Sequence, residues 1–169
     1  METAVQTEKG SLLMHSDCVP EAVISVFAAT CGTAVAPDPS SADEAFADST
    51  VMAVISLVGE VEWTLFLDLP APSACLLAAK FAGFEIPFDS ADMGDAIGEL
   101  ANILAGDIKA RLDSRGVRAD LSLPSVLRGE HVNLVLQKGL PRNKWLFACP
   151  AGKIRAGIVA GRQVLGAKG

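Results

Sequence analysis

Three polar residues lie along one face of a predicted helix in the middle of the chain. Asp95, Glu99 and Asn102 are spaced i, i+4 and i+7. At about 100° per residue, this spacing puts them in one row, within reach of a single partner. Gly106 falls on the same row one turn later and leaves open space there. A carboxylate pair alone is usually a solvated face, but asparagine is a poor mid-helix residue because its side chain competes for the backbone. The row is therefore a candidate functional surface.

The helix that carries this row must bury its opposite side. Its apolar residues recur with helical spacing and predict one stripe that packs on a core: Ile97, Leu100, Ala101, Leu104, Ile108 and Leu112. Gly98 and Gly106 each cost about 1 kcal/mol relative to alanine inside a helix. We expect a helix that carries such residues on its outer face to use that face.

The combined pattern resembles a known signature. Asp95, Glu99 and Asn102 are followed by 21 residues and then by Pro124. This arrangement is similar to the motif of the CheC/CheX/FliY family, which are phosphatases of phosphorylated CheY, the chemotaxis response regulator. The surrounding sequence Asp-Ala-Ile-Gly-Glu-Leu-Ala-Asn resembles the CheX branch in particular, and the resemblance spans roughly residues 19–161. It implies an α+β fold, with a mostly antiparallel β-sheet and two long antiparallel helices packed on one face.

The resemblance also implies a role for each residue of the motif. Asn102 would orient the water that attacks the aspartyl phosphate of a receiver domain, because a carboxamide can accept from the water and donate elsewhere at once. Glu99 would pair with the receiver's active-site lysine, and these two are the implied catalytic residues. Asp95, Gly106 and Pro124 would border the docked receiver. The phosphorylated CheY-like receiver would bring the Mg²⁺, so no metal site or cofactor of the chain's own is expected.

Other functions compete with catalysis on this face. A non-catalytic or weakly catalytic interaction module would use it to dock a receiver, the receptor deamidase CheD or a component of the flagellar switch, as some family members do. Asp92, Asp95 and Glu99 could hold a divalent cation, but the helix dipole explains acidic residues at a helix start equally well. A hydrolase that uses Asp95 and Glu99 as an acid–base pair is disfavoured, because an exposed helix face does not supply the pocket it would need.

The composition is that of a globular, acidic protein. The chain has 169 residues, half of them hydrophobic, and a net charge of −6, so we expect one domain with a proper core and no primary partner among nucleic acids or anionic membrane surfaces. No apolar run approaches the ~20 residues of a membrane span, and the first residues lack a signal-peptide pattern. The pattern favours a cytoplasmic protein with reduced, buried thiols at its four scattered cysteines: Cys18, Cys31, Cys75 and Cys149.

Apolar periodicity, capping residues and turn residues divide the chain into elements. Residues 1–16 are expected to be an extension, either disordered or a short extra strand, and residues 17–165 the single CheX-like domain. Helices are predicted at about 17–30, 73–82 and 90–115. Strands are predicted at 51–58, 61–69, 125–127, 131–137, 144–149 and 154–160, with a solvated loop at 37–50. The first two and the last two of these strands are expected to form hairpins.

Three further details concern assembly and the number of sites. Ile24 stands where the first half of the chain would need an asparagine three residues after Glu21, so we expect one site per chain. Trp63 occupies a position where family members more often have a small residue, and it either packs in the core or alters a dimer edge or partner surface. Single-site CheX-like proteins are expected to be homodimers, which would also cover unpaired strand edges.

Overall fold

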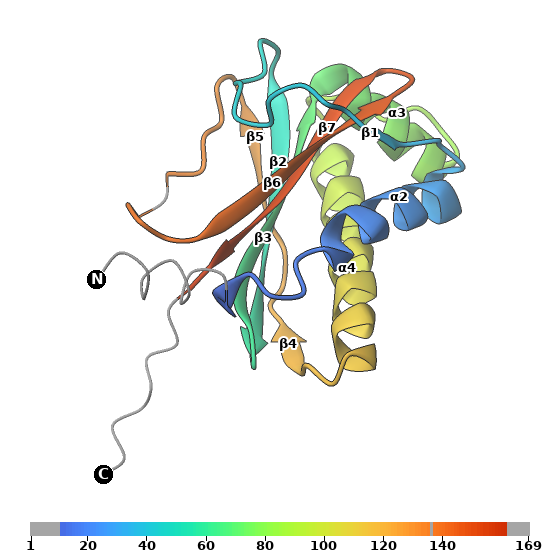
Figure 1. The fold of residues 1–169 in the computed structure, drawn as a ribbon. Coiled ribbons are helices and arrows are strands. Elements are labelled where there is room, and N and C mark those ends of the chain that lie inside the picture. The colour runs from blue at the N-terminus through green and yellow to red at the C-terminus, as the bar shows by residue number, and fades with distance from the viewer. Residues whose placement is uncertain (1–10, 136, 162–169) are drawn as a thin grey trace.

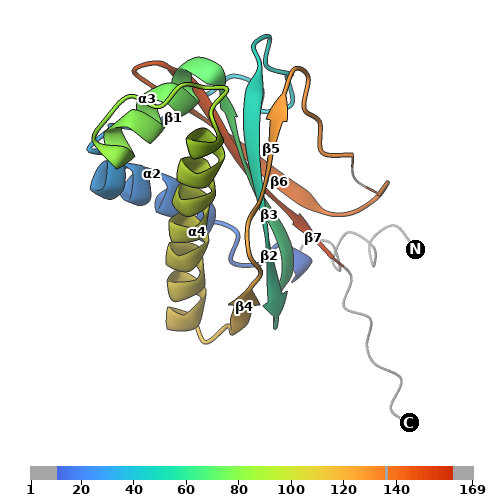
Figure 2. The same ribbon diagram turned by 180° about the vertical axis from the view of Figure 1, so that it is seen from behind.

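Three helices cover one face of a single antiparallel sheet in the computed structural model, which describes residues 11–135 and 137–161 (Figure 1). The strand order is β1-β6-β7-β3-β2-β4, and β5 also pairs with β2. Seen from behind, β4 and β5 follow one another along the outer edge of β2, beside the long helix α4 (Figure 2). The α+β class and the mostly antiparallel sheet are confirmed, and the helix predicted at about 73–82 is present as α3 beside the two longer helices α2 and α4.

The observed elements lie close to the predicted ones. The helices are α2 (Cys18–Cys31), α3 (Ala71–Ala82) and α4 (Ala91–Ser114). The strands are β1 (Ala36–Pro37), β2 (Thr50–Gly59), β3 (Glu62–Pro70), β4 (Ala119–Leu121), β5 (Ser125–Gly129), β6 (Arg142–Cys149) and β7 (Gly152–Ala160). The β2–β3 and β6–β7 hairpins form as predicted. The short strands β1 and β4 were not anticipated.

The strand predicted at residues 131–137 is wrong. His131 adopts a left-handed φ of 52° in the turn that ends β5, and the chain then crosses to β6 without strand pairing in the part that the structure describes. The apolar residues of this connection pack on the sheet face away from the helices, against Met52, Phe66 and Val159. They are Val132, Leu134 and Leu140. Their alternation therefore comes from covering a sheet, and it mimics the pattern of a strand.

Local signals explain where the helices begin and end. Ser90 caps α4, because its hydroxyl oxygen accepts from the backbone N–H of Met93 at 3.3 Å. Gly32 ends α2 with a left-handed φ of 57°, and its N–H reaches the carbonyl of Ala28. These caps let the apolar stripe of α4 face the sheet, where all six predicted stripe residues are buried: Ile97, Leu100, Ala101, Leu104, Ile108 and Leu112.

The main core lies between the helices and the sheet. The central strands β2 and β3 are almost wholly buried, because helices cover one side and the connections after β1 and β5 cover parts of the other. All four cysteines are free; Cys18 and Cys31 are buried, whereas Cys75 and Cys149 are half-buried. Burial raises the pKa of the Cys18 thiol to about 11. Within the described ranges, no helix is both long and apolar enough to span a bilayer.

Trp63 belongs to the core. It lies on β3, an inner strand between β7 and β2, and its side chain is only 2% exposed. Its indole N–H donates to the backbone carbonyl of Leu12 at 3.0 Å, which ties the segment before α2 to the sheet. The alternative in which Trp63 alters a sheet edge is therefore wrong. Residues 11–12 are helical and residues 13–16 form turns, so none of them forms the extra strand that was considered, and the same expectation for residues 1–10 lies outside the described residues.

Candidate functional site

The predicted row lies on the outer face of α4. Asp95, Glu99 and Asn102 are exposed, and Gly106 is half-buried one turn beyond them. A Cβ atom on Gly106 would meet no atom within 4 Å. Within residues 11–135 and 137–161, the side chains of the three polar residues make no hydrogen bond or ion pair. An amide and two carboxylates are thus presented to solvent in one line, free to contact a partner.

A break in strand register brings a fourth motif residue to this helix. Leu57 of β2 lies opposite Leu121 of β4, and Val54 of β2 lies opposite Ser125 of β5. Between these two pairs β2 advances by three residues, whereas the segment from β4 to β5 advances by four. The extra residue is a β-bulge, a feature that redirects side chains at sheet edges. Ser122 holds it in place: its N–H donates to the carbonyl of Ser56, and its hydroxyl oxygen accepts from the N–H of Ser56 at 2.9 Å.

The bulge directs Pro124 towards α4. The Cγ atom of Pro124 lies 3.8 Å from the position that a Cβ on Gly98 would take, and a Val126 methyl lies at 3.4 Å from it. Gly98 is therefore buried under β5, which corrects the interpretation that placed it on the outer face with Gly106. Because Asn102 follows Gly98 by one helical turn, Pro124 borders the exposed row, and all four motif residues lie in one region.

Arg128 joins the start of α4 to β5. Its guanidinium donates to the backbone carbonyls of Phe88 and Ser90, at 2.8 and 2.6 Å. These contacts hold the first turn of α4 beside the strand that carries Val126, so Arg128 positions the beginning of the row. The sequence contains no local signal for this contact, because its partners are backbone atoms 38 and 40 residues away.

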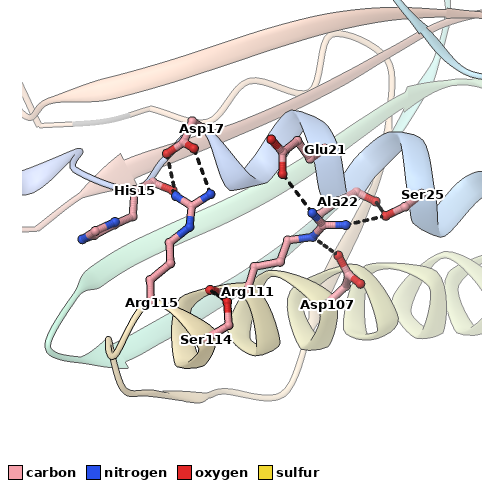
Figure 3. Close-up of polar contacts among 9 residues, drawn as sticks. All are labelled: His15, Asp17, Glu21, Ala22, Ser25, Asp107, Arg111, Ser114 and Arg115. Atoms are coloured by element: carbon pink, nitrogen blue, oxygen red, sulfur yellow. Dashed lines mark hydrogen bonds and ion pairs between the residues drawn. The ribbon is translucent and has the colours of Figure 1, made fainter.

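Two arginines fasten the other end of α4 to α2 (Figure 3). Arg111 donates to Asp107 at 2.6 Å, to Glu21 at 2.9 Å and to the Ser25 hydroxyl at 3.0 Å. Arg115 donates to both carboxylate oxygens of Asp17, at 2.7 and 2.9 Å. Hydrogen bonding to Arg115 lowers the pKa of the Asp17 carboxyl. As residue numbers rise along α2 they fall along α4, so the two helices run in opposite senses, as predicted.

The same contacts bear on a second site in the first half of the chain. Glu21, which precedes Ile24 by three residues, is paired with Arg111, and Ile24 packs partly buried against the core. Arg111 thus already pairs with the Glu21 carboxylate that a second site on α2 would need. Sequence analysis did not single out Arg111 or Arg115, although the i, i+4 spacing of Asp107 and Arg111 is a signal that could have indicated part of this network.

The exposed row is acidic. Asp92, Asp95 and Glu99 are all exposed on the first three turns of α4, and the positive end of the helix dipole favours the carboxylate of Asp92 in the first turn. Within the described parts of the chain, no group of three or more His, Cys, Asp or Glu side chains is arranged to hold a metal ion. The face therefore suits a partner that carries positive charge.

A known protein family matches the part of the chain that carries this row. The family model described as chemotaxis phosphatase CheX matches residues 51–146, which run from β2 to β6 and include the whole row and Pro124. No curated protein sequence matches the chain.

Solved chemotaxis proteins share the fold. CheX from Vibrio vulnificus aligns with a TM-score of 0.76 at 16% identity, covering 88% of this chain and 97% of its own. A chemotaxis protein from Desulfovibrio vulgaris Hildenborough gives a TM-score of 0.75 at 21% identity, covering 87% and 96% of the two chains. CheX in the CheX–CheY–BeF₃–Mg²⁺ complex from Borrelia burgdorferi gives 0.68 at 20% identity, covering 89% and 99%.

Proposed function

This chain belongs to the chemotaxis phosphatase CheX family, and from that premise we propose that it hydrolyses the aspartyl phosphate of a CheY-like receiver domain. Family membership supports a chemotaxis role connected with CheY. The structurally similar CheX of Borrelia burgdorferi was crystallised with CheY, BeF₃ and Mg²⁺, which supports a receiver as the partner of this chain as well.

One observation carries the catalytic proposal: Asn102 is exposed beside Glu99 on α4 and is not engaged by any other described residue. Hydrolysis of an aspartyl phosphate requires a water molecule that attacks the phosphorus in line with the leaving oxygen. The protein therefore has mainly to position that water and to stabilise the negative charge on the phosphoryl oxygens in the transition state. The Asn102 carboxamide can accept a hydrogen bond from the water while its N–H group donates elsewhere. A mid-helix asparagine without a partner among the described residues is suited to this task.

The neighbouring residues would dock and orient the receiver. Glu99 would pair with the receiver's active-site lysine, and Asp95 and Gly106 would border that contact from either end of the row. Pro124 would shape the adjoining loop, because it packs on the helix one turn before Asn102. The receiver would contribute the Mg²⁺ that stabilises its phosphoryl group, so the chain supplies positioning groups and forms no covalent intermediate.

We also propose that the protein works in the cytoplasm as a homodimer. β1 pairs only with Phe147 and Ala148 of β6, so the stretch of β6 from Arg142 to Trp145 has no strand partner on its outer edge among the described residues. Unpaired strand edges are sites where a second chain can add. Sedimentation at micromolar concentration measures the oligomeric state directly.

The test is phosphate release from phosphorylated CheY-like receivers with and without this protein. We expect the protein to accelerate loss of the phosphoryl group from at least one receiver, in a manner that saturates with receiver concentration. Binding of a phosphorylated receiver without acceleration would identify a docking module instead of a phosphatase. Absence of both binding and acceleration across receivers would reject both functions.

A further inference from the structure

Leu123 is unusually exposed for a leucine, with 89% of its surface accessible. It lies in the bulge between β4 and β5, directly before Pro124, whose ring packs on α4 at Gly98, one turn before Asn102. Single exposed apolar residues are common on protein surfaces, so the interest of Leu123 comes from its place next to Pro124.

The backbone around Leu123 is anchored on both sides. On the preceding side, Ser122 exchanges two hydrogen bonds with Ser56, and its hydroxyl donates to the carbonyl of Leu123 at 3.0 Å. On the following side, Pro124 packs against Gly98. The bulge thus holds the leucine at one place on the rim of the site.

We infer that Leu123 is a docking and specificity residue for the phosphorylated receiver, an inference that rests on the proposed function. The receiver surface that meets the row would combine a positive group opposite Glu99 with an apolar patch opposite Leu123. Covering Leu123 removes its apolar surface from water, which favours association with a partner that presents an apolar patch.

The charge of the face favours a receiver over a second copy of this chain. Asp92, Asp95 and Glu99 are exposed along the same helix, so two copies that met through this region would bring like charges together. Juxtaposed like charges oppose association. A receiver that presents its active-site lysine has the complementary charge.

The role of Leu123 differs from that of Asn102. Leu123 would contribute equally before and during hydrolysis, because it contacts the receiver away from the reacting atoms. A contact of this kind changes KM and leaves kcat unchanged. Receivers with a polar residue opposite Leu123 would bind less well, which makes the position a determinant of partner choice.

The experiment compares Leu123→Ala, Leu123→Met and a control, Val135→Ala, in the full chain. Val135 is 92% exposed, but it lies in the β5–β6 connection, whose neighbours Val132 and Leu134 pack on the opposite face of the sheet. We expect Leu123→Ala to raise the KM for the phosphorylated receiver by about 10-fold, equivalent to ~1.4 kcal/mol, with kcat unchanged. Leu123→Met should keep the wild-type KM, and so should Val135→Ala.

The outcomes separate this inference from the proposed function. If wild type hydrolyses the receiver and Leu123→Ala has the same KM, the inference about Leu123 fails and the phosphatase proposal stands. If wild type binds the receiver without hydrolysis, the phosphatase proposal fails, and a 10-fold loss of affinity in Leu123→Ala would still support the docking role. A change of sedimentation in Leu123→Ala without a change of KM would assign Leu123 to self-association and overturn the inference.

Discussion

Pro124 packs over Gly98, with its Cγ atom 3.8 Å from where a Cβ on that glycine would lie. The contact joins the β4–β5 bulge to the middle of α4, and it leaves room there for only a small side chain. A small residue at this position lets the strand that carries Pro124 approach the helix that carries Asn102.

Substitution of Gly98 should separate helix stability from site geometry. Gly98→Ala should be tolerated with full activity, because its Cβ would make an ordinary contact of 3.4 Å with Val126. Gly98→Leu should push Pro124 away and slow phosphate release. Gly94→Leu is the matched control, since no atom lies within 4 Å of a Cβ there. Equal activity of the two leucine variants would show that the Pro124 contact does not shape the site.

Substitutions of Asn102 and Glu99 should affect receiver binding and phosphate release differently. Asn102→Ala should keep the fold, because alanine favours the helix, and should still bind the receiver while phosphate release falls by about 10²-fold or more. Glu99→Ala should weaken binding as well, because it removes one charge of a contact. Asn133→Ala, in the exposed β5–β6 connection, controls for the loss of an amide. Wild-type rates in Asn102→Ala would reject its catalytic role.

The isolated protein should not bind a catalytic metal through its acidic row. If the receiver supplies the Mg²⁺, titration calorimetry with Mg²⁺ or Mn²⁺ should give no tight signal in wild type or in Glu99→Ala. A tight signal that disappears in Glu99→Ala would instead support a metal-dependent hydrolase built on Asp95 and Glu99. Phosphate release should correspondingly follow the Mg²⁺ affinity of the receiver.

Arg111 should stabilise the fold without affecting the reaction. Its guanidinium donates hydrogen bonds to Glu21, Asp107 and Ser25. Arg111→Ala should therefore lower the free energy of unfolding by about 1 kcal/mol, which is the upper end of the range for exposed ion pairs. Lys109→Ala is the control on the same helix, because among the described residues Lys109 pairs only with Asp113 of α4, and the change should cost a few tenths of a kcal/mol. Urea unfolding measures both. Equal losses would show that the bridge to α2 adds nothing.

Asp68 should make stability depend on pH. It is 2% exposed on β3, and burial raises the pKa of its carboxyl to about 6, against the opposing charge of Arg155 at 3.2 Å. The folded state then binds a proton more readily than the unfolded state, whose pKa is about 3.8. The contribution of Asp68 to stability therefore falls as pH rises from about 4 to 6, by ~3 kcal/mol for a shift of about two pKa units.

The measurement is urea unfolding of wild type and Asp68→Asn between pH 4 and 7. The free energy of unfolding of wild type should fall relative to that of the variant from about pH 4 to 6. Above about pH 6 the two free energies should change in parallel. Taking the difference cancels the opposite contributions of Asp38 and Asp43, whose pKa values are lowered by hydrogen bonds to Ser40 and Lys144. If wild type instead gains stability relative to Asp68→Asn as pH rises, Arg155 keeps Asp68 ionised and the prediction is wrong.

Local features of the sequence were sufficient to determine the face that carries the candidate chemistry. The row of Asp95, Glu99 and Asn102 depends only on helical periodicity, which operates over a few residues. The start of its helix is also a local feature, because the Ser90 side chain caps the N–H of Met93, which is only three residues away. The hairpins were predictable for the same reason, because their strands are adjacent in the chain and joined by short turns.

Tertiary structure decided which distant segments meet. Whether residues 131–137 pair as a strand or cover the sheet depends on the neighbours available to them, and alternating apolar residues fit either outcome. Gly98 lies under β5 only because the bulge at Ser122 turns Pro124 towards α4. Trp63 is internal because β7, from much later in the chain, pairs with the edge of β3 that β2 leaves open. Such contacts depend on strand order and register, which join residues too far apart for local periodicity to specify.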